Sequence, residues 1–573
     1  MLSSNARRLG QYGLLSTLMA TAAIGGVHAA AARTPAGPAP IRAKMAWWRD
    51  ARFGLFIHWG PVSLTGQEIS WSRANSNPKC PNNGGIPIDV YDNLYQKFNP
   101  TQFDAKEWVN VARRAGMKYM VLTAKHCDGF LLWPSQASGY NMSATPYHKD
   151  ICGALSDAAH QQGMKIGWYY SPMDWRDPDF RTARNAAFVG RMHTELHELL
   201  SNYGKIDMLW FDWDCGDPAY DQPRTYRLVK SLQPKILIDN RLDLGPHSNN
   251  REILSPNADY YTPEQELSAY DDQRPWESCM TLGEQWSWKP NDKLKSVPAV
   301  VRALASCAGG DGNLLLDVGP MPDGRIEPRQ VTILNGVGDW LKTHGASIYG
   351  TRGGPYKPAV NYVSTRKGNT IYIHVLGWNG AAVSLPALPA RIVKATVLGG
   401  GSAAFQQSDD SVRLTVPAAA HDAGDTVVAL TLAGSAMRLA PIESVFQAGA
   451  ASASNVFQNQ GEYGPDKAFD GNDKTRWAAD GGAKTAWLQW DYAAPTRING
   501  VTIAEAYAGR VTSFQIQYRP AAGGSWITAA RGTHLGEEFH CAFPPVTARA
   551  VRLQILDATD GPTITEMKIQ TAK

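Results

Sequence analysis

Short apolar runs alternate with longer amphipathic segments along the chain as far as Thr343. Apolar runs of this length, bounded by polar residues or glycine, predict buried strands, and the amphipathic segments predict helices. The expected strands lie at 53–60, 119–124, 165–172, 205–214, 236–241, 276–281 and 313–320. The expected helices lie at 105–115, 155–162, 185–203, 225–232, 297–308 and 330–343. This alternation predicts a parallel α/β barrel of the (β/α)8 type, irregular because only seven strands are evident. One further strand is expected near 259–261.

Beyond residue 350 the pattern changes to apolar and polar residues in strict alternation, interrupted by Gly and Pro turns. This pattern is typical of antiparallel β structure. We therefore expect a multidomain protein, with a barrel at 33–349, a small β-sandwich at 350–440 and a second β-sandwich module at 441–573.

The first 32 residues have the pattern of a secretory signal peptide. Arg7 and Arg8 precede an apolar run over 12–27, and four alanines follow at 29–32. A membrane anchor is the alternative, but the run is short for a span and is interrupted by small and polar residues. The chain is thus expected to be exported, to the periplasm, the cell exterior or a lysosome-like compartment. A Pro/Ala-rich segment over 33–43 is interpreted as a linker.

The amino-acid composition indicates which kinds of molecule the protein binds. The 573 residues are 43% hydrophobic and 19% charged, which allows large cores, and the net charge of +4 is spread without a basic run. Nucleic acid is therefore not an expected partner, and no further segment reaches membrane-spanning length. The 19 Trp and 22 Tyr suit stacking on sugar rings. The seven Cys are scattered without a CxxC pair, unlike a zinc site or a dense disulfide scaffold.

Candidate chemistry lies at the ends of the expected strands. The stretch 205–214 ends in carboxylates, and Trp210, Asp212 and Asp214 share one face of that strand. In a parallel barrel the carboxyl ends of the strands meet at one mouth, where active sites lie. The strand-end residues are His58, His126, Tyr169, Asp212, Asp214, Arg241 and Glu277. Two carboxylates among His, Trp and Arg suit glycoside hydrolysis, with one as nucleophile and the other as general acid/base.

Six motifs in order carry a family resemblance: FGLFIHWG, TAKHCDGFLLW, GWYYSPMDW, MLWFDWD, PWESCMTLGEQWSW and GNLLLDVGPMPDG. Together, over about 45–350, the chain resembles the α-L-fucosidases of glycoside hydrolase family 29. The AFDGNDKTRW stretch resembles discoidin-type (coagulation factor 5/8 C) carbohydrate-binding modules. The resemblance implies a retaining exo-α-L-fucosidase that removes terminal α-L-fucose from glycoconjugates through a covalent fucosyl-enzyme, without a cofactor, and has fucosylated glycans as its partners.

The same resemblance implies residue roles. Asp212 is the expected nucleophile, with Asp214 as competitor, and Glu277 is the expected acid/base, with Glu264 as competitor. The expected fucose-binding residues are His58, Glu68, Trp71, His126, Tyr169, Trp210 and Arg241. The chain differs from many family members in having Cys127 where they have a second adjacent His, and in separating Glu68 from Trp71.

Two other functions fit part of the sequence. A metal-dependent hydrolase could use His58, His126 and Asp212, but no His-x-His pair or third His ligand accompanies them. A non-catalytic sugar-binding protein would need to have lost one carboxylate, and both are present. In the C-terminal module, Asp470, Asp473 and Glu566 either bind a structural Ca²⁺ or form an ordinary polar turn.

Overall fold

A computed structural model describes residues 39–74, 84–212, 220–243, 257–267, 270–359, 361–378, 382–409, 411–443, 446–448, 450–472 and 474–572. The expected signal peptide, Asp214 and Asp473 lie outside these ranges. Within them, no helix combines the length and the apolar character needed to cross a membrane.

Seven parallel strands form the first sheet, in the order β5-β4-β3-β2-β1-β7-β6. They are β1 (Phe53–Ile57), β2 (Tyr119–Lys125), β3 (Lys165–Tyr170), β4 (Met208–Phe211), β5 (Leu237–Ile238), β6 (Glu277–Thr281) and β7 (Asn313–Val318). The segment around Tyr260 makes parallel bridges to Asp239 after β5 and, through Tyr261, to Trp276 before β6. It thus joins the two ends of the sheet, where a further strand was expected.

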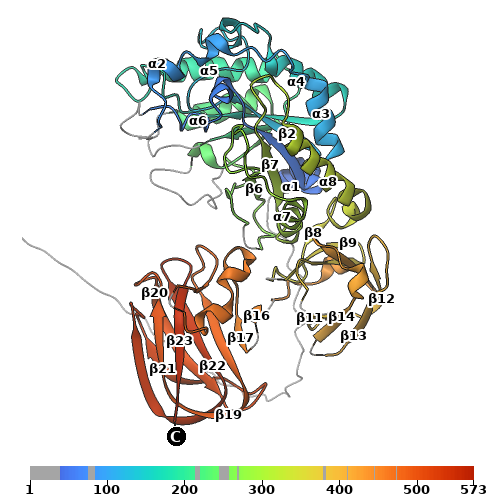
Figure 1. Cartoon of the computed structure of the whole chain (residues 1–573), viewed down its shortest axis with the longest axis vertical. Helices are drawn as coiled ribbons and strands as arrows, with labels where there is room; N and C mark the ends of the chain where they lie inside the picture. Colours follow the sequence, from blue (N-terminus) through green and yellow to red (C-terminus); the bar gives the residue numbers. More distant parts are fainter. Residues whose placement is uncertain are drawn as a thin grey trace, which may run out of the picture. The chain divides into compact units, whose positions relative to one another are not determined.

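Helices lie outside the strands (Figure 1). Those that follow strands β1, β2, β3, β4, β6 and β7 are α3 (Ala105–Arg114), α4 (Ile151–Gln161), α5 (Asn185–Ser201), α6 (Gln222–Leu232), α7 (Val297–Gly309) and α8 (Pro328–His344), and a single turn, α2 (Ile88–Tyr91), precedes α3. The Asp104 carboxylate accepts hydrogen bonds from the first-turn N–H groups of Lys106 and Glu107, which fixes the start of α3. The linker expected over 33–43 is wrong in its last residues, because helix α1 (Ala39–Ala51) begins there.

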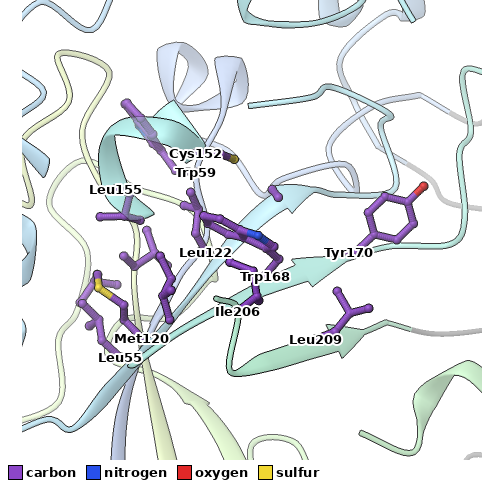
Figure 2. Close-up of a cluster of buried hydrophobic side chains, with 14 of the residues drawn as sticks. Leu55, Trp59, Met120, Leu122, Cys152, Leu155, Trp168, Tyr170, Ile206 and Leu209 are labelled. Atoms are coloured by element: carbon purple, nitrogen blue, oxygen red, sulfur yellow. The ribbon is translucent and has the colours of Figure 1, made fainter. Parts of the chain in front are cut away.

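Side-chain alternation along the strands separates two cores. Leu55, Met120, Leu122 and Trp168 point outward into a layer shared with the helices, as Figure 2 shows. The residues between them point inward and pack with buried side chains of α1, which closes the amino-terminal end of the barrel. This inner cluster includes Met45, Trp48, Phe56, Val121, Met208, Trp210, Cys279 and Leu315.

Two antiparallel sheets follow the barrel. One has the order β12-β15-β10-β9-β8 and the other the order β11-β14-β13. Their strands are β8 (Arg352–Gly353), β9 (Tyr362–Lys367), β10 (Thr370–Val375), β11 (Ala382–Pro386), β12 (Ile392–Val397), β13 (Ala404–Gln407), β14 (Ser411–Thr415) and β15 (Thr426–Leu432). They confirm the expected small β-sandwich.

The C-terminal sheet has the order β16-β17-β19-β22-β20-β21, with β23 beside β19 and β18 beside β23. Its strands are β16 (Phe446–Ala448), β17 (Ala451–Ala453), β18 (Trp477–Ala478), β19 (Ala486–Glu505), β20 (Val511–Arg519), β21 (Ile527–Gly532), β22 (Phe539–Ala558) and β23 (Thr563–Thr571). Long strands β19 and β22 pair antiparallel along most of their length and form its centre.

Candidate active site

A cavity of about 130 Å³ lies at the carboxyl ends of the barrel strands. Seven of the nine residues expected at the site line it, and four more join them. The lining residues are Phe56, His58, Trp71, His126, Tyr169, Trp210, Asp212, Arg241, Glu264, Cys279 and Trp286. Its volume is well below the roughly 300–1,000 Å³ of sites for drug-sized ligands, so it suits one sugar ring.

Asp212 follows β4 directly, and both of its carboxylate oxygens are held. The Tyr169 hydroxyl donates to Oδ2 at 2.5 Å, and Arg241 Nη1 donates to Oδ1 at 2.7 Å. Burial, and then the Asp212 charge, raise the pKa of Tyr169 well above its usual value, so the phenol keeps its proton and remains a donor. The carboxylate is therefore fixed in orientation, as a nucleophile must be.

Arg241 connects the two carboxylates of the cavity. Its Nη1 lies 2.9 Å from Glu264 Oε2 as well as 2.7 Å from Asp212 Oδ1. Its Nε donates to the Thr262 hydroxyl at 2.8 Å, and its guanidinium lies 4.4 Å from the Trp210 ring centroid. Burial opposes the charge, but attraction to Glu264 and Asp212 outweighs it and raises the Arg241 pKa.

His126 is neutral and oriented by a serine. Burial lowers its pKa to about 4, although the Asp212 charge opposes this shift. Its Nδ1 lies 2.5 Å from Ser70 Oγ, and that hydroxyl also accepts the backbone N–H of Asp128 at 2.9 Å. Ser70 is fully buried with a φ of 57°, in the left-handed region that a non-glycine residue occupies at a cost. Because Nδ1 is engaged, Nε2 is the nitrogen available to a ligand.

His58 is fixed in a similar way by a carboxyl group of β7. Its Nδ1 lies 2.7 Å from Asp317 Oδ1. Burial, followed by the proximity of His126 and Arg241, lowers the pKa of His58 well below its usual value. This imidazole also presents Nε2 to the cavity.

Aromatic rings form the cavity walls. Tyr169 stacks on His126 with centroids 5.2 Å apart and on Trp210 at 5.6 Å. On another side, Trp286 packs against Phe56 at 6.0 Å and against His58 at 4.8 Å. These rings offer apolar faces to the C–H groups of a sugar beside polar groups for its hydroxyls.

Glu68 does not line the cavity, although it was expected to bind substrate. Its carboxylate instead accepts the backbone N–H groups of Trp286, at 2.8 Å, and of Ser287, at 3.1 Å. It thereby holds the wall residue Trp286, which the sequence reading missed. Trp71 does line the cavity, and its ring contacts Trp175 at 5.1 Å.

Glu277 is also outside the cavity, so the expectation that it lies at the mouth is not met. It is the first residue of β6, and the cavity-lining Cys279 follows two residues later on the same face. At about 3.3 Å per residue, Glu277 lies roughly 7 Å closer to the amino-terminal end. It is fully buried and accepts hydrogen bonds from Tyr119, at 2.5 Å, and Trp48, at 3.2 Å. Of the two glutamates weighed from the sequence, Glu264 is the one at the cavity.

Cys127, which stands where many family members have a second His, packs in the barrel wall. Its side chain is 1% exposed and its Sγ lies 3.2 Å from Ser171 Oγ. Burial, and then the Asp212 charge, raise the pKa of this thiol well above its usual value, which keeps it protonated.

Metal-binding arrangements of three or more His, Cys, Asp or Glu side chains do not occur among the described residues. In the C-terminal module, the Asp470 carboxylate accepts from the Thr475 hydroxyl at 2.9 Å and from the Asn472 N–H at 3.0 Å. Asp473 lies outside the described ranges, so calcium binding there stays a prediction.

Comparison with known proteins finds similar family models, structures and sequences. Residues 30–346 match the family model Alpha-L-fucosidase, and residues 449–568 match the F5/8 type C domain. Alpha-L-fucosidase isoenzyme 1 from Paenibacillus thiaminolyticus is 31% identical, with 68% of this chain and 99% of that chain covered and a TM-score of 0.61. A Bacteroides thetaiotaomicron alpha-L-fucosidase, solved as a trapped covalent intermediate, is 26% identical over 68% of this chain and 96% of that one, with a TM-score of 0.60. Human tissue alpha-L-fucosidase is 27% identical over 383 residues, 62% of this chain and 80% of its own.

Proposed function

Because the chain belongs to the α-L-fucosidase family and is thus a glycoside hydrolase, we propose that it is a retaining exo-enzyme. It removes terminal α-L-fucose from glycoconjugates by double displacement. Asp212 attacks the anomeric carbon to form a fucosyl-enzyme, and a second carboxyl group protonates the leaving oxygen and then activates water. The covalent intermediate trapped in the Bacteroides relative supports this route.

One observation carries the proposal. Asp212 Oδ1 and Glu264 Oε2 contact the same Arg241 nitrogen, at 2.7 and 2.9 Å. The two oxygens are therefore no farther apart than these distances combined. Retaining glycosidases have carboxyl groups about 5–5.5 Å apart, whereas inverting enzymes need roughly 6.5–9.5 Å to admit a water molecule. The spacing here fits retention.

We assign the acid/base role to Glu264 in place of Glu277. A general acid must reach the leaving oxygen directly or through one water. Glu264 lines the cavity with its side chain 22% exposed, whereas Glu277 is fully buried below it.

The wall residues bind the sugar. His58 and His126 direct a ring nitrogen toward fucose hydroxyls, and Arg241 adds charged donors. Trp71, Tyr169 and Trp210 keep the binding roles expected from the sequence. Phe56 and Trp286 form an apolar corner that suits the methyl group of a 6-deoxy sugar.

The C-terminal module and the first 32 residues bring the barrel to its substrate. The F5/8 type C module binds glycan and holds the barrel near its substrate, which raises the local substrate concentration. Residues 1–32 direct export and are removed.

The proposal is tested with a chromogenic aryl α-L-fucoside in the presence and absence of a chelator. We expect turnover under both conditions, with α-fucose as the first anomer seen by proton NMR. Release of β-fucose first would overturn retention, and loss of turnover with chelator would favour the metal-dependent alternative.

A further inference from the structure

The outer face of the C-terminal sheet combines arginine, glutamine and tryptophan side chains. In β19, β20 and β22 the residues Leu488, Ile516 and Leu553 point into the module core. The residues between them face away from that core, and their longer side chains, except that of Gln489, are partly exposed. These longer residues are Trp487, Gln489, Asp491, Gln515, Gln517, Arg519, Arg552 and Gln554. With Trp526, which precedes β21, they form a surface that we call the arginine face.

Strand register arranges these side chains in rows. Gln489, Arg552 and Gln517 are direct neighbours on three adjacent strands. Two residues further along each strand, Ala550 lies between Asp491 and Arg519. Asp491 and Arg519 pair with each other across the small, fully buried side chain of Ala550.

Two guanidinium groups share one tryptophan on this face. The guanidinium carbon of Arg552 lies 4.2 Å from the Trp526 ring centroid, and that of Arg519 lies 5.0 Å from it. Stacking of this kind holds both cations at one place on the sheet.

The charges of this pair are not balanced. Arg519 pairs with Asp491 at 3.0 Å. Arg552 donates both Nε and Nη2 to the neutral Gln517 amide oxygen, at 3.0 and 2.6 Å, and no carboxylate of the described residues lies within 4.0 Å of it. Burial, followed by repulsion from Arg519, lowers the pKa of Arg552 to about 10. A further anion at this place would therefore bind favourably.

We propose that the arginine face binds an anionic polysaccharide, with one sulfate or carboxylate group against Arg552 and Arg519 and the neighbouring sugar rings on Trp526. The side-chain amides supply donors and acceptors for hydroxyl groups along the chain. Guanidinium forks suit both anions, because each offers oxygens at matching spacing. This binding requires no part of the barrel cavity.

A nucleic acid is the less favoured occupant. Phosphate backbones are usually met by many cations in a groove, whereas this face has a single unpaired guanidinium and a row of neutral amides. The module is also attached to a member of a glycosidase family, whose substrates are sugars.

The test is affinity electrophoresis of the full-length protein in gels that contain dextran sulfate, polygalacturonate or unsubstituted dextran. We expect retardation by at least one anionic polymer and none by dextran. Dextran sulfate alone would identify sulfate as the recognised group, and polygalacturonate alone would identify carboxylate. Arg552→Gln and Trp526→Ala should each weaken retardation about tenfold or more in affinity, since each removes a direct contact with the ligand.

The matched control is Arg413→Gln on β14, an exposed arginine of the other sandwich that loses the same charge. It should bind as the unmodified protein does. All variants should keep their melting temperature and aryl fucoside turnover, and if Arg552→Gln fails to fold, Trp526→Ala decides. Equal losses in the control, absence of retardation by both anionic polymers, or stronger retardation by a single-stranded oligonucleotide would overturn the proposal.

Discussion

Asp212 and Glu264 meet at a single atom, since Arg241 Nη1 lies 2.7 Å from one carboxylate and 2.9 Å from the other. One guanidinium group thus contacts both carboxyl groups of the cavity. The three groups form a coupled unit, so a change at either carboxylate alters the position and partner of the arginine. Mutational effects at Asp212 and Glu264 are therefore expected to be non-additive.

Replacing Asp212 by alanine removes the proposed nucleophile while leaving the Glu264 carboxyl group in place. We expect aryl fucoside turnover to fall by about a thousandfold or more. Sodium azide should restore part of it by occupying the vacated space and attacking the anomeric carbon, to give the β-fucosyl azide. An active Asp212→Ala together with an inactive Asp214→Ala would move the role to Asp214.

Glu264→Ala should separate substrates by their leaving groups. A good leaving group such as dinitrophenolate needs no proton, whereas a sugar alcohol does. We expect the variant to lose about a hundredfold or more on a fucosylated oligosaccharide and much less on the activated aryl fucoside. Similar losses on both substrates would mean that Glu264 only positions Arg241.

Glu277→Gln tests a structural role for the buried carboxyl group. Burial raises the pKa of Glu277 to about 7, against the lowering effect of hydrogen bonds from Tyr119 and Trp48. The folded state therefore favours the protonated form. Its contribution to stability is full below the unfolded pKa of 4.5 and is lost as pH rises through about 7.

The stability difference between the unmodified protein and Glu277→Gln should accordingly shift by about 3 kcal/mol in favour of the glutamine variant between pH 4 and pH 8. Urea unfolding of both proteins across this range measures it. The leaving-group dependence of the variant should stay unchanged. A difference that is constant with pH, or a loss confined to poor leaving groups, would contradict the structural role.

Truncation after Glu443 should spare the barrel chemistry. The cut lies beyond Ile442, whose backbone pairs with the segment at Tyr356 and belongs to the middle sandwich. We expect kcat/KM on an aryl fucoside to be retained and efficiency on large, immobilised glycans to fall, because tethering is lost. A folded truncation that is inactive on the aryl fucoside would show that the C-terminal module helps build the active site.

The fold class could be predicted from periodicity because each strand and helix is specified by its own residues. The segment at Tyr260 was harder to predict from the sequence. It makes single bridges without forming a regular strand, so it carries no repeating pattern. Helix α1 was not predicted, and its first residues, which include Pro40 and two alanines, also suit a linker.

Site residues that directly follow their own strands, such as His58 and Asp212, were found for the same local reason. Glu277 was placed at the mouth because of the role that the family resemblance implies, although the strand expected over 276–281 already puts this residue near its amino-terminal end. Trp286 was missed because Glu68, more than two hundred residues earlier, holds it through backbone N–H groups. Such long-range contacts leave no local pattern in a sequence.

Helix α1 closes the amino-terminal end of the barrel with Met45 and Trp48, so the cavity has a floor. Substrate and products therefore enter and leave such a cavity through the same opening, at the carboxyl ends of the strands. The aglycone departs and the hydrolytic water arrives along the same route, and both meet the same side of the sugar, while Asp212 occupies the other. Under the proposed mechanism, water attacks the face that the aglycone has left, and retention of configuration follows because Asp212 covers the opposite face.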